Sequence, residues 1–437
     1  MNKLVIAILM ISVSPVAVKG TYAQTEVSHN QDIKIEKSIV TLDEAIKKAN
    51  DVSPVSRITT SIEGISKGER QQAALMPNPE LSVEAENIAG QGNYKGVDAL
   101  ETTIGVSQLI EIGGKRSARI RMADEGLNVA GYESQSAKLN LTYDVTVAYI
   151  EAVAAEEQVK IAEEQKKLAL GTFDTVAKRV NAAADPVFQK SKADVALSAA
   201  KIAVKQAQQQ VKITKRKLAS FWDGSISNIQ LDHSFFRKIE SPKAYEGIIS
   251  ALKSNPDYQR WNALYAQSQA ALDLEKSNAI PDPSINVGVR DFRESGDQAF
   301  VVGVSIPFAV FNRNQGNINK AGHTTAKVDA ERQKVWIDLE TSLNTLTEEL
   351  ESSFSEAQMI SENTLPAAQK AFSEARKGHN AGKFAYLEVL DAQRTLSDVR
   401  EEYNDALKRY HLTRAEINRL TASNTTLITT SKGNSNE

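Results

Sequence analysis

Apolar and polar residues alternate along four short stretches of the chain, which occur as two pairs. The apolar members are Leu81, Val83 and Ala85, then Leu100, Ile104 and Val106 in the first pair, and Ile285, Val287 and Val289, then Phe300, Val302, Val304, Ile306 and Phe308 in the second. A period of two is typical of strands with one apolar face. Polar, glycine-containing segments at 90–93 and 294–297 join each pair. The pattern therefore predicts two β-hairpins, at about 80–110 and about 283–309.

Long stretches with a helical period follow the hairpins. From Lys115 to Gly171 there is no proline, which predicts a rod of roughly 85 Å at 1.5 Å per residue. Apolar positions in this stretch, and in another near the C-terminus, recur at intervals of three and four. The two seams are Leu141, Val145, Ala148, Ala152, Ala155, Val159 and Ala162, and Val389, Ala392, Leu396, Val399, Tyr403, Ala406, Tyr410, Thr413, Ile417 and Leu420. Such spacing predicts helices wound as coiled coils.

The order helix, hairpin and long helix pair occurs twice. Each hairpin follows a Pro-x-Pro turn, at 77–79 and 281–283, and runs into a helix through a short polar bend, at 113–116 and 312–315. The helix pairs are predicted to turn back at 181–186 and 378–382. The predicted organisation is repeat 1 at 41–223, a linker at 224–243, repeat 2 at 244–422 and a polar C-terminal tail at 423–437.

The N-terminus is predicted to be a secretory signal peptide, residues 1–23, followed by an N-terminal extension at 24–40. Lys3 precedes an apolar run from Leu4 to Ile11, and cleavage fits after Ala23. An N-terminal membrane anchor is the alternative, but Pro15 breaks a run that is already short for a span. No other stretch has the roughly 20 apolar residues of a transmembrane helix. A mature chain that resides in a membrane must therefore cross it as strands.

Charge and residue chemistry argue against several classes of function. The 52 Lys and Arg residues nearly balance the 55 Asp and Glu residues, so no global field points to nucleic acid as a partner. Without cysteine the chain can form neither disulfides nor thiolate metal sites. The five histidines form no pair with metal-ligand spacing, and we find neither a catalytic triad nor a phosphate loop. We therefore expect no enzyme activity, no cofactor and no metal site.

Two hairpins cannot form a closed barrel by themselves. Alternation over about ten residues is the pattern of transmembrane β-barrel strands. Backbone groups left unpaired at the edge of a sheet cost several kcal/mol each in lipid. Other copies of the chain must complete the sheet, so the pattern predicts a closed oligomer.

Several motifs resemble the TolC-like outer membrane factor family over nearly the whole mature chain, 40–422. They are Pro77-Asn78-Pro79-Glu80-Leu81, the segment QLIEIGGKRSARI at 108–120, Ile306-Pro307-Phe308, Asn312-Arg313-Asn314-Gln315-Gly316, and Gly382 with LEVLDAQR at 387–394. The glycine-glycine-lysine-arginine bend is most similar to the cobalt-zinc-cadmium resistance branch.

The resemblance implies a mainly α-helical chain with a membrane β part. Three copies would form one outer membrane β-barrel of four strands per chain, continued by a long coiled-coil α-helical barrel in the periplasm of a Gram-negative cell. The homotrimer would be a passive exit duct, with heavy-metal cations as candidate substrates, working with a periplasmic adaptor and an inner membrane RND pump. A periplasmic helical-hairpin adaptor is the alternative, but it would carry one long hairpin, whereas the unit occurs twice here.

The resemblance also assigns candidate residues near the second helix turn. Glu388 and Asp391 lie three apart on one helix face and match acidic aperture residues of the family, whose carboxylate rings attract cations. A solvated helix face is the alternative. His379 and Phe384 stand where better-known members carry an arginine and a tyrosine that hold the gate closed. We expect His379 to be an exposed structural residue.

Two further sets of residues are expected at surfaces. The adaptor-contacting tips are Asn181, Asp185, Pro186, Gly378 and Gly382. The bend at the membrane face consists of Gly113, Gly114, Lys115 and Arg116, whose cations, with Arg119 and Arg121, are expected to meet anionic lipid headgroups.

Overall fold

The computed structural model describes residues 39–222 and 230–423. The predicted signal peptide, most of the predicted N-terminal extension and nearly all of the polar tail lie outside these ranges. The elements of the first half are β1 (Ile39–Val40), α1 (Leu42–Val52), α2 (Pro54–Ala73), β2 (Glu80–Glu86), β3 (Glu101–Leu109), α3 (Lys115–Asn181) and α4 (Val187–Ala219). Those of the second half are β4 (Gln230–Leu231), α5 (Tyr245–Ile248), α6 (Pro256–Asn278), β5 (Ser284–Phe292), β6 (Asp297–Ser305), α7 (Gln315–Met359), α8 (Leu365–Asn380) and α9 (Tyr386–Leu420).

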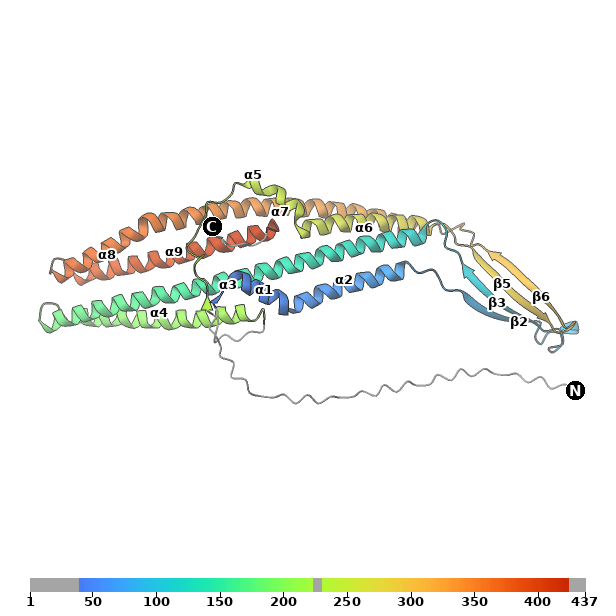
Figure 1. Cartoon of the computed structure of the whole chain (residues 1–437), viewed down its shortest axis with the longest axis horizontal. Coiled ribbons are helices and arrows are strands. Elements are labelled where there is room, and N and C mark those ends of the chain that lie inside the picture. The colour runs from blue at the N-terminus through green and yellow to red at the C-terminus, as the bar shows by residue number, and fades with distance from the viewer. Residues whose placement is uncertain (1–38, 223–229, 424–437) are drawn as a thin grey trace, which may run out of the picture. The chain divides into compact units, whose positions relative to one another are not determined.

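The two hairpins form one antiparallel sheet in the order β2-β3-β5-β6, which confirms the prediction of four strands. The sheet lies at one end of the helices (Figure 1). In the described part of the chain β2 and β6 are the outer strands, and each has one edge without a strand beside it. The two repeats therefore meet in the middle of the sheet, between β3 and β5.

The register of the sheet gathers the apolar side chains on one face. The rows across all four strands are Val83, Ile104, Val289 and Phe300, and Leu81, Val106, Val287 and Val302. All of these side chains are exposed, from 40% for Val289 to 86% for Phe300. The other face is polar, and Arg290 joins strands there by ion pairs with Glu86 (2.8 Å) and Glu101 (3.0 Å). No element of the described chain covers the apolar face.

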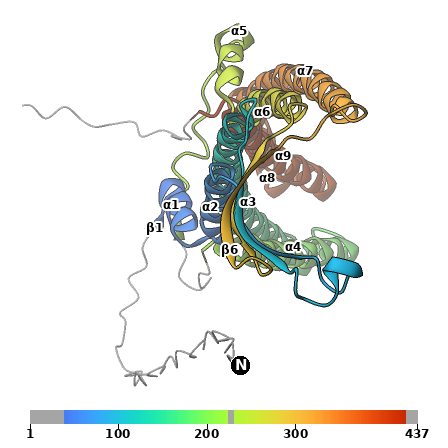
Figure 2. The same cartoon turned by 90° about the vertical axis from the view of Figure 1, so that its right-hand side faces the viewer.

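The central element of the helical part is α3, whose 67 residues correspond to about 100 Å. It packs against α2, α4, α6 and α9, and lies between α4 and the α8–α9 pair (Figures 1 and 2). Val145, Ala148 and Ala152 of the predicted seam are fully buried. Leu396 and Tyr410 of the C-terminal seam are buried as well, so both seams are confirmed as packing surfaces. None of the helices within 39–222 and 230–423 combines the length and apolar content of a membrane span.

The long helix of repeat 1, α3, is continuous, whereas the corresponding helix of repeat 2 is divided into α7 and α8. A π-helical turn at Ile360–Thr364 separates α7 from α8, and Pro366 stands in the first turn of α8. Proline has no N–H to donate to the carbonyl four residues earlier. A π turn accommodates such a missing bond without ending the rod.

A short parallel pair of strands fastens the linker to the middle of α3. β1 pairs with β4 through Ile39 opposite Gln230 and Val40 opposite Leu231. The buried Tyr149 hydroxyl donates to the Val40 carbonyl (2.7 Å) and accepts from the Asp232 amide (3.0 Å). One side chain of α3 thus holds two distant segments together.

Candidate functional site

Both helix pairs turn at the end of the helices opposite the sheet (Figure 1). The first turn follows Asn181, the last residue of α3, and ends at Pro186, which precedes α4. Asp185 accepts hydrogen bonds from Nε (2.7 Å) and Nη2 (3.2 Å) of Arg179. These bonds lower the pKa of Asp185, so its carboxylate is ionised and fixed within the turn.

The second turn is shaped by two glycines and one aromatic ring. Gly382 has a φ of +73°, which favours glycine. A Cβ added to Gly378 would overlap the ring of Phe384, so the ring lies directly against the backbone of α8. Phe384 itself is half exposed, at 49%. The predicted tip residues of repeat 2 thus form one compact turn.

His379 is buried, with 3% of its surface exposed, so the expectation of an exposed residue was wrong. Its Nδ1 lies 3.1 Å from the Phe384 carbonyl, and its Nε2 lies 3.8 Å from Asp185 of the other turn. The two turns of one chain are therefore in contact. Phe372, Ala375 and His379 recur at helical spacing and are all buried, a signal that could have predicted this burial.

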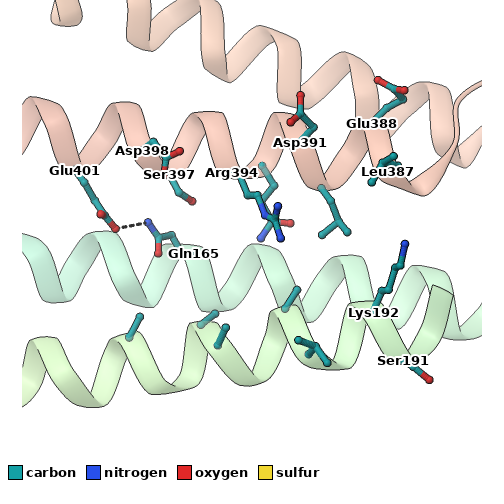
Figure 3. Close-up of a pocket in the computed structure, with 17 residues that line it drawn as sticks. Gln165, Ser191, Lys192, Leu387, Glu388, Asp391, Arg394, Ser397, Asp398 and Glu401 are labelled. Atoms are coloured by element: carbon teal, nitrogen blue, oxygen red, sulfur yellow. Dashed lines mark hydrogen bonds between the residues drawn. The ribbon is translucent and has the colours of Figure 1, made fainter. Parts of the chain in front are cut away.

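Glu388 and Asp391 are exposed and lie on the same side of α9 (Figure 3). They line a groove of about 910 Å³ between α4 and α9. Among the described residues neither carboxylate has an ion-pair partner. Their carboxylates point to the side of α9 away from α3 and α4, whereas Arg394 points toward those helices (Figure 3), so both predicted aperture residues carry unpaired charges at the margin of the groove.

Sequence reasoning missed four charged residues of the same groove, of which Lys192 belongs to α4. Arg394, Asp398 and Glu401 follow on α9 and also line it. Glu401 points toward α3 and accepts a hydrogen bond from Gln165 (3.2 Å), as Figure 3 shows. Asp398 stands seven residues after Asp391, so the heptad spacing could have indicated it.

The bend between β3 and α3 is built as predicted from two glycines with positive φ, +71° at Gly113 and +76° at Gly114. A Cβ on Gly113 would lie 2.7 Å from Cδ1 of Ile280, so only glycine fits there. Arg116 is exposed and donates from Nε to the Ala74 carbonyl (2.7 Å).

Lys115 does not face outward, which corrects the expectation that it meets lipid headgroups. It is 8% exposed, and its Nζ lies 2.6 Å from the Asp282 carboxylate. Arg119 is also bonded internally, to Glu111. The reason is tertiary, since Asp282 comes from the second repeat. Headgroup contact by Arg116 and Arg121 stays a prediction.

His233 lies in a charge cluster away from the turns. Its Nε2 lies 2.6 Å from Glu156 and its Nδ1 lies 2.8 Å from Glu157. Hydrogen bonds to Glu156 and Glu157 raise the pKa of His233 to about 9, and the bond from His233 is the main cause that lowers the pKa of Glu157 to about 2. Three further cations join the cluster, Arg237 and Lys160 at Glu157 and Lys215 at Glu156. Within 39–222 and 230–423 no cluster of Asp, Glu and His side chains could hold a metal ion.

Known proteins match this chain over most of its length. The outer membrane efflux protein family matches residues 68–224 and 248–423. The cobalt-zinc-cadmium resistance protein CzcC of Cupriavidus metallidurans is 28% identical over 355 residues, which are 81% of this chain and 83% of CzcC. The nickel-cobalt-cadmium resistance protein NccC of Alcaligenes xylosoxydans xylosoxydans is 25% identical over 61% of this chain and 60% of its own.

Solved structures share the fold at low sequence identity. CusC has a TM-score of 0.75 at 17% identity, covering 90% of this chain and 95% of its own. The outer membrane protein VceC of Vibrio cholerae has a TM-score of 0.74 at 17% identity, covering 87% and 95%. Since the family matches both halves and these structures share the helix and sheet arrangement, the chain belongs to the outer membrane efflux protein family and is an outer membrane efflux channel, not an enzyme.

Proposed function

We propose that three copies of the chain form one channel across the outer membrane. Each copy supplies four strands to a closed β-barrel and its long helices to a tunnel in the periplasm. The channel is a passive exit duct for heavy-metal cations. A separate inner membrane pump of the RND type supplies the energy, and a periplasmic adaptor connects it to the duct.

The uncovered apolar face of the sheet is the observation that carries this proposal. Phe300, Val302 and Leu81 are 86%, 71% and 74% exposed on that face. In water such a face would drive aggregation. In a bilayer it is the outward face that a transmembrane barrel requires.

The outer strands support closure by other copies. All neighbours in the order β2-β3-β5-β6 are antiparallel, so β2 and β6 run in opposite directions. β6 of one copy can therefore continue the antiparallel sheet beside β2 of the next. A closed ring leaves no backbone edge facing lipid. The number three rests on the resemblance to the TolC-like family.

The cation substrate is proposed from the relatives and from the groove. CzcC and NccC are named for resistance to cobalt, zinc, cadmium and nickel. The exposed Glu388 and Asp391 would form rings of carboxylates in a trimer, and such rings concentrate cations at a pore. The two helix turns, with Asn181, Asp185 and Gly382, are the proposed adaptor contacts because they lie at the end opposite the sheet.

The proposal is tested with protein purified from outer membranes in a mild detergent. We expect a mass of roughly three times that of the mature chain, which is smaller than the 47.7 kDa of the full sequence by the predicted signal peptide, and stable, cation-favouring conductance steps in planar bilayers. Cells that lack the chain should become sensitive to cobalt, zinc or cadmium, and expression should restore resistance. A monomer that stays in solution without detergent would overturn the proposal.

A further inference from the structure

Repeat 1 and repeat 2 meet in a tight junction beside the sheet. It joins the trailing segment of repeat 1, residues 110–115 after β3, to the leading segment of repeat 2, residues 279–283 before β5. The Ile110 amide donates to the Pro283 carbonyl (2.8 Å) and the Ile112 amide donates to Oδ1 of Asp282 (2.9 Å). Lys115 closes the junction with its buried ion pair to Asp282.

Each repeat has both a leading and a trailing segment, so one segment of each kind is not used in this junction. The leading segment of repeat 1, residues 75–79, has Asn78 between its two prolines where repeat 2 has Asp282. In the trailing segment of repeat 2, residues 306–315, Asn314 precedes α7 with φ 60° and ψ 17°, just as Gly114 precedes α3 with φ 76° and ψ 16°. Gln315 therefore stands in the place of Lys115.

Within one chain these segments lie at opposite edges of the sheet. The leading segment of repeat 1 enters β2, and the trailing segment of repeat 2 leaves β6 (Figure 1). Asn78 and Gln315 are both exposed. Met76, Phe308 and Phe311 expose 70%, 92% and 91% of their surfaces. Among residues 39–222 and 230–423, the leading segment of repeat 1 and the trailing segment of repeat 2 therefore have no junction partner.

We infer that adjacent copies of the chain form this junction across their boundary, with Gln315 of one copy beside Asn78 of the next. The inference rests on the proposed closed ring of chains. Two amides take the place of the Lys115–Asp282 ion pair. Within its own chain the Gln315 amide accepts from the Arg313 N–H (2.8 Å) and donates to the Phe311 carbonyl (3.2 Å). A side-chain amide has two N–H donors and two acceptor lone pairs, so Gln315 keeps one of each for Asn78, and the pair can exchange hydrogen bonds without burying a charge.

The register expected from the repeat supports the inference independently. β3 pairs with β5 so that Leu109 faces Ser284. Ser305 ends β6 as Leu109 ends β3, and Glu80 begins β2 as Ser284 begins β5. Ser305 would thus face Glu80 of the next copy. This register sets Val304 opposite Leu81, Val302 opposite Val83 and Phe300 opposite Ala85, so the apolar face continues unbroken, whereas a shift by one residue would break it.

The junction between copies should contain apolar side chains that cover it, which the junction within one chain lacks. Residues 110–113 separate β3 from Gly114, whereas 306–313 separate β6 from Asn314, so the second trailing segment is longer by four residues. The longer segment carries Phe308 and Phe311. Their exposed rings would cover Leu75 and Met76 of the neighbouring copy, which are 52% and 70% exposed.

The absence of cysteine from the chain makes cross-linking decisive. The double variant Asn78→Cys/Gln315→Cys, treated in outer membranes with a short bifunctional thiol reagent, should give covalent dimers and trimers on denaturing gels. The matched control Lys115→Cys/Asp282→Cys should cross-link within the chain and stay monomeric. The second pair Met76→Cys/Phe311→Cys should behave like the first.

The mass of the native protein in detergent distinguishes a failure of the proposed junction from a failure of the proposed channel. A trimer in detergent whose pairs 78/315 and 76/311 both give only monomers on denaturing gels would overturn the junction and leave the proposed channel intact. A monomer in detergent would overturn both. Higher species from the single variants Asn78→Cys or Gln315→Cys would show unspecific contact and also reject the pairing.

Discussion

In the proposed channel, individual carboxylates beside the groove between α4 and α9 are expected to act on ions. Glu388 and Asp391 have no ion-pair partner among the described residues, so their charges are not neutralised locally. Glu374 on α8 is also exposed but does not line the groove. Position relative to the groove, rather than charge alone, should therefore decide which carboxylates affect conduction.

We predict that Glu388→Ala/Asp391→Ala lowers the preference for cations over anions several-fold, by roughly the effect of removing a charged ring from a pore mouth. The measurement is the reversal potential in planar bilayers under a salt gradient. Glu374→Ala, which removes the same kind of charge outside the groove, should leave the selectivity at the wild-type value. Unchanged selectivity of the double variant would reject the aperture role.

His233 links the stability of the helical part to pH. Its pKa of about 9 lies above its ordinary value of 6.5 because Glu156 and Glu157 bind the protonated ring. A raised pKa means that the folded state binds the proton more tightly than the unfolded state. The stabilisation is therefore complete below about pH 6.5 and is lost as the pH rises through about 9.

We predict that His233→Gln lowers the free energy of unfolding at pH 7 by about 2 kcal/mol, the scale of hydrogen bonds to charged groups. It should also flatten the decline in stability that the wild type shows between pH 6.5 and 9. Thermal melting followed by circular dichroism in detergent measures both effects. His323→Gln, at an exposed position of α7, is the control and should keep the wild-type profile.

At the scale of elements, alanine sets the distance between the helices. Ala148 and Ala152 of α3 have no exposed surface, and Ala406 on α9 has none either. Small side chains in a seam allow helix axes to approach closely, and a larger side chain must push the partner away. The long rods depend on this spacing along many turns.

We predict that Ala152→Leu destabilises the helical part by about 1–3 kcal/mol, because overpacking a filled seam forces neighbouring side chains out of their rotamers. The measurement is the midpoint of thermal unfolding of the detergent-solubilised protein. Ala199→Leu, on the exposed wall of α4, adds the same volume without overpacking and should shift the midpoint little. Equal shifts for the two variants would contradict the assigned seam.

At the scale of the whole molecule, the two faces of the sheet meet different surroundings. Val302 lies on the apolar face and its neighbour Val301 on the polar one, because successive residues of a strand point to opposite sides. The proposed barrel turns the first toward lipid and the second toward its interior. Two adjacent valines therefore test the orientation of the sheet.

We predict that Val302→Lys reduces the amount of trimer in outer membranes strongly, since a lysine on the lipid face of a barrel costs about 2–4 kcal/mol near the bilayer midplane. Val301→Lys adds the same charge to the interior and should assemble normally. Membrane fractionation followed by unboiled gel electrophoresis measures both. Normal assembly of the Val302→Lys variant would mean that this face does not contact lipid.

Local patterns in the sequence determined the elements and their faces. The period of two placed Val83, Ile104 and Phe300 on one face because strand side chains alternate regardless of what surrounds them. The three-four spacing identified the buried seams for the same kind of reason. The repeated order of elements established the two halves, although the boundaries at 41–223 and 244–422 stay predictions.

Only the tertiary structure decided which charged and polar groups find partners. Lys115 turns inward because Asp282 arrives from the second repeat, and His379 lies beside Asp185 because the two helix turns touch. His233 binds Glu156 and Glu157 because β1 and β4 fasten the linker to α3. Such contacts join residues far apart in the chain, and side-chain type and local spacing carry no information about which distant group will lie within hydrogen-bonding distance.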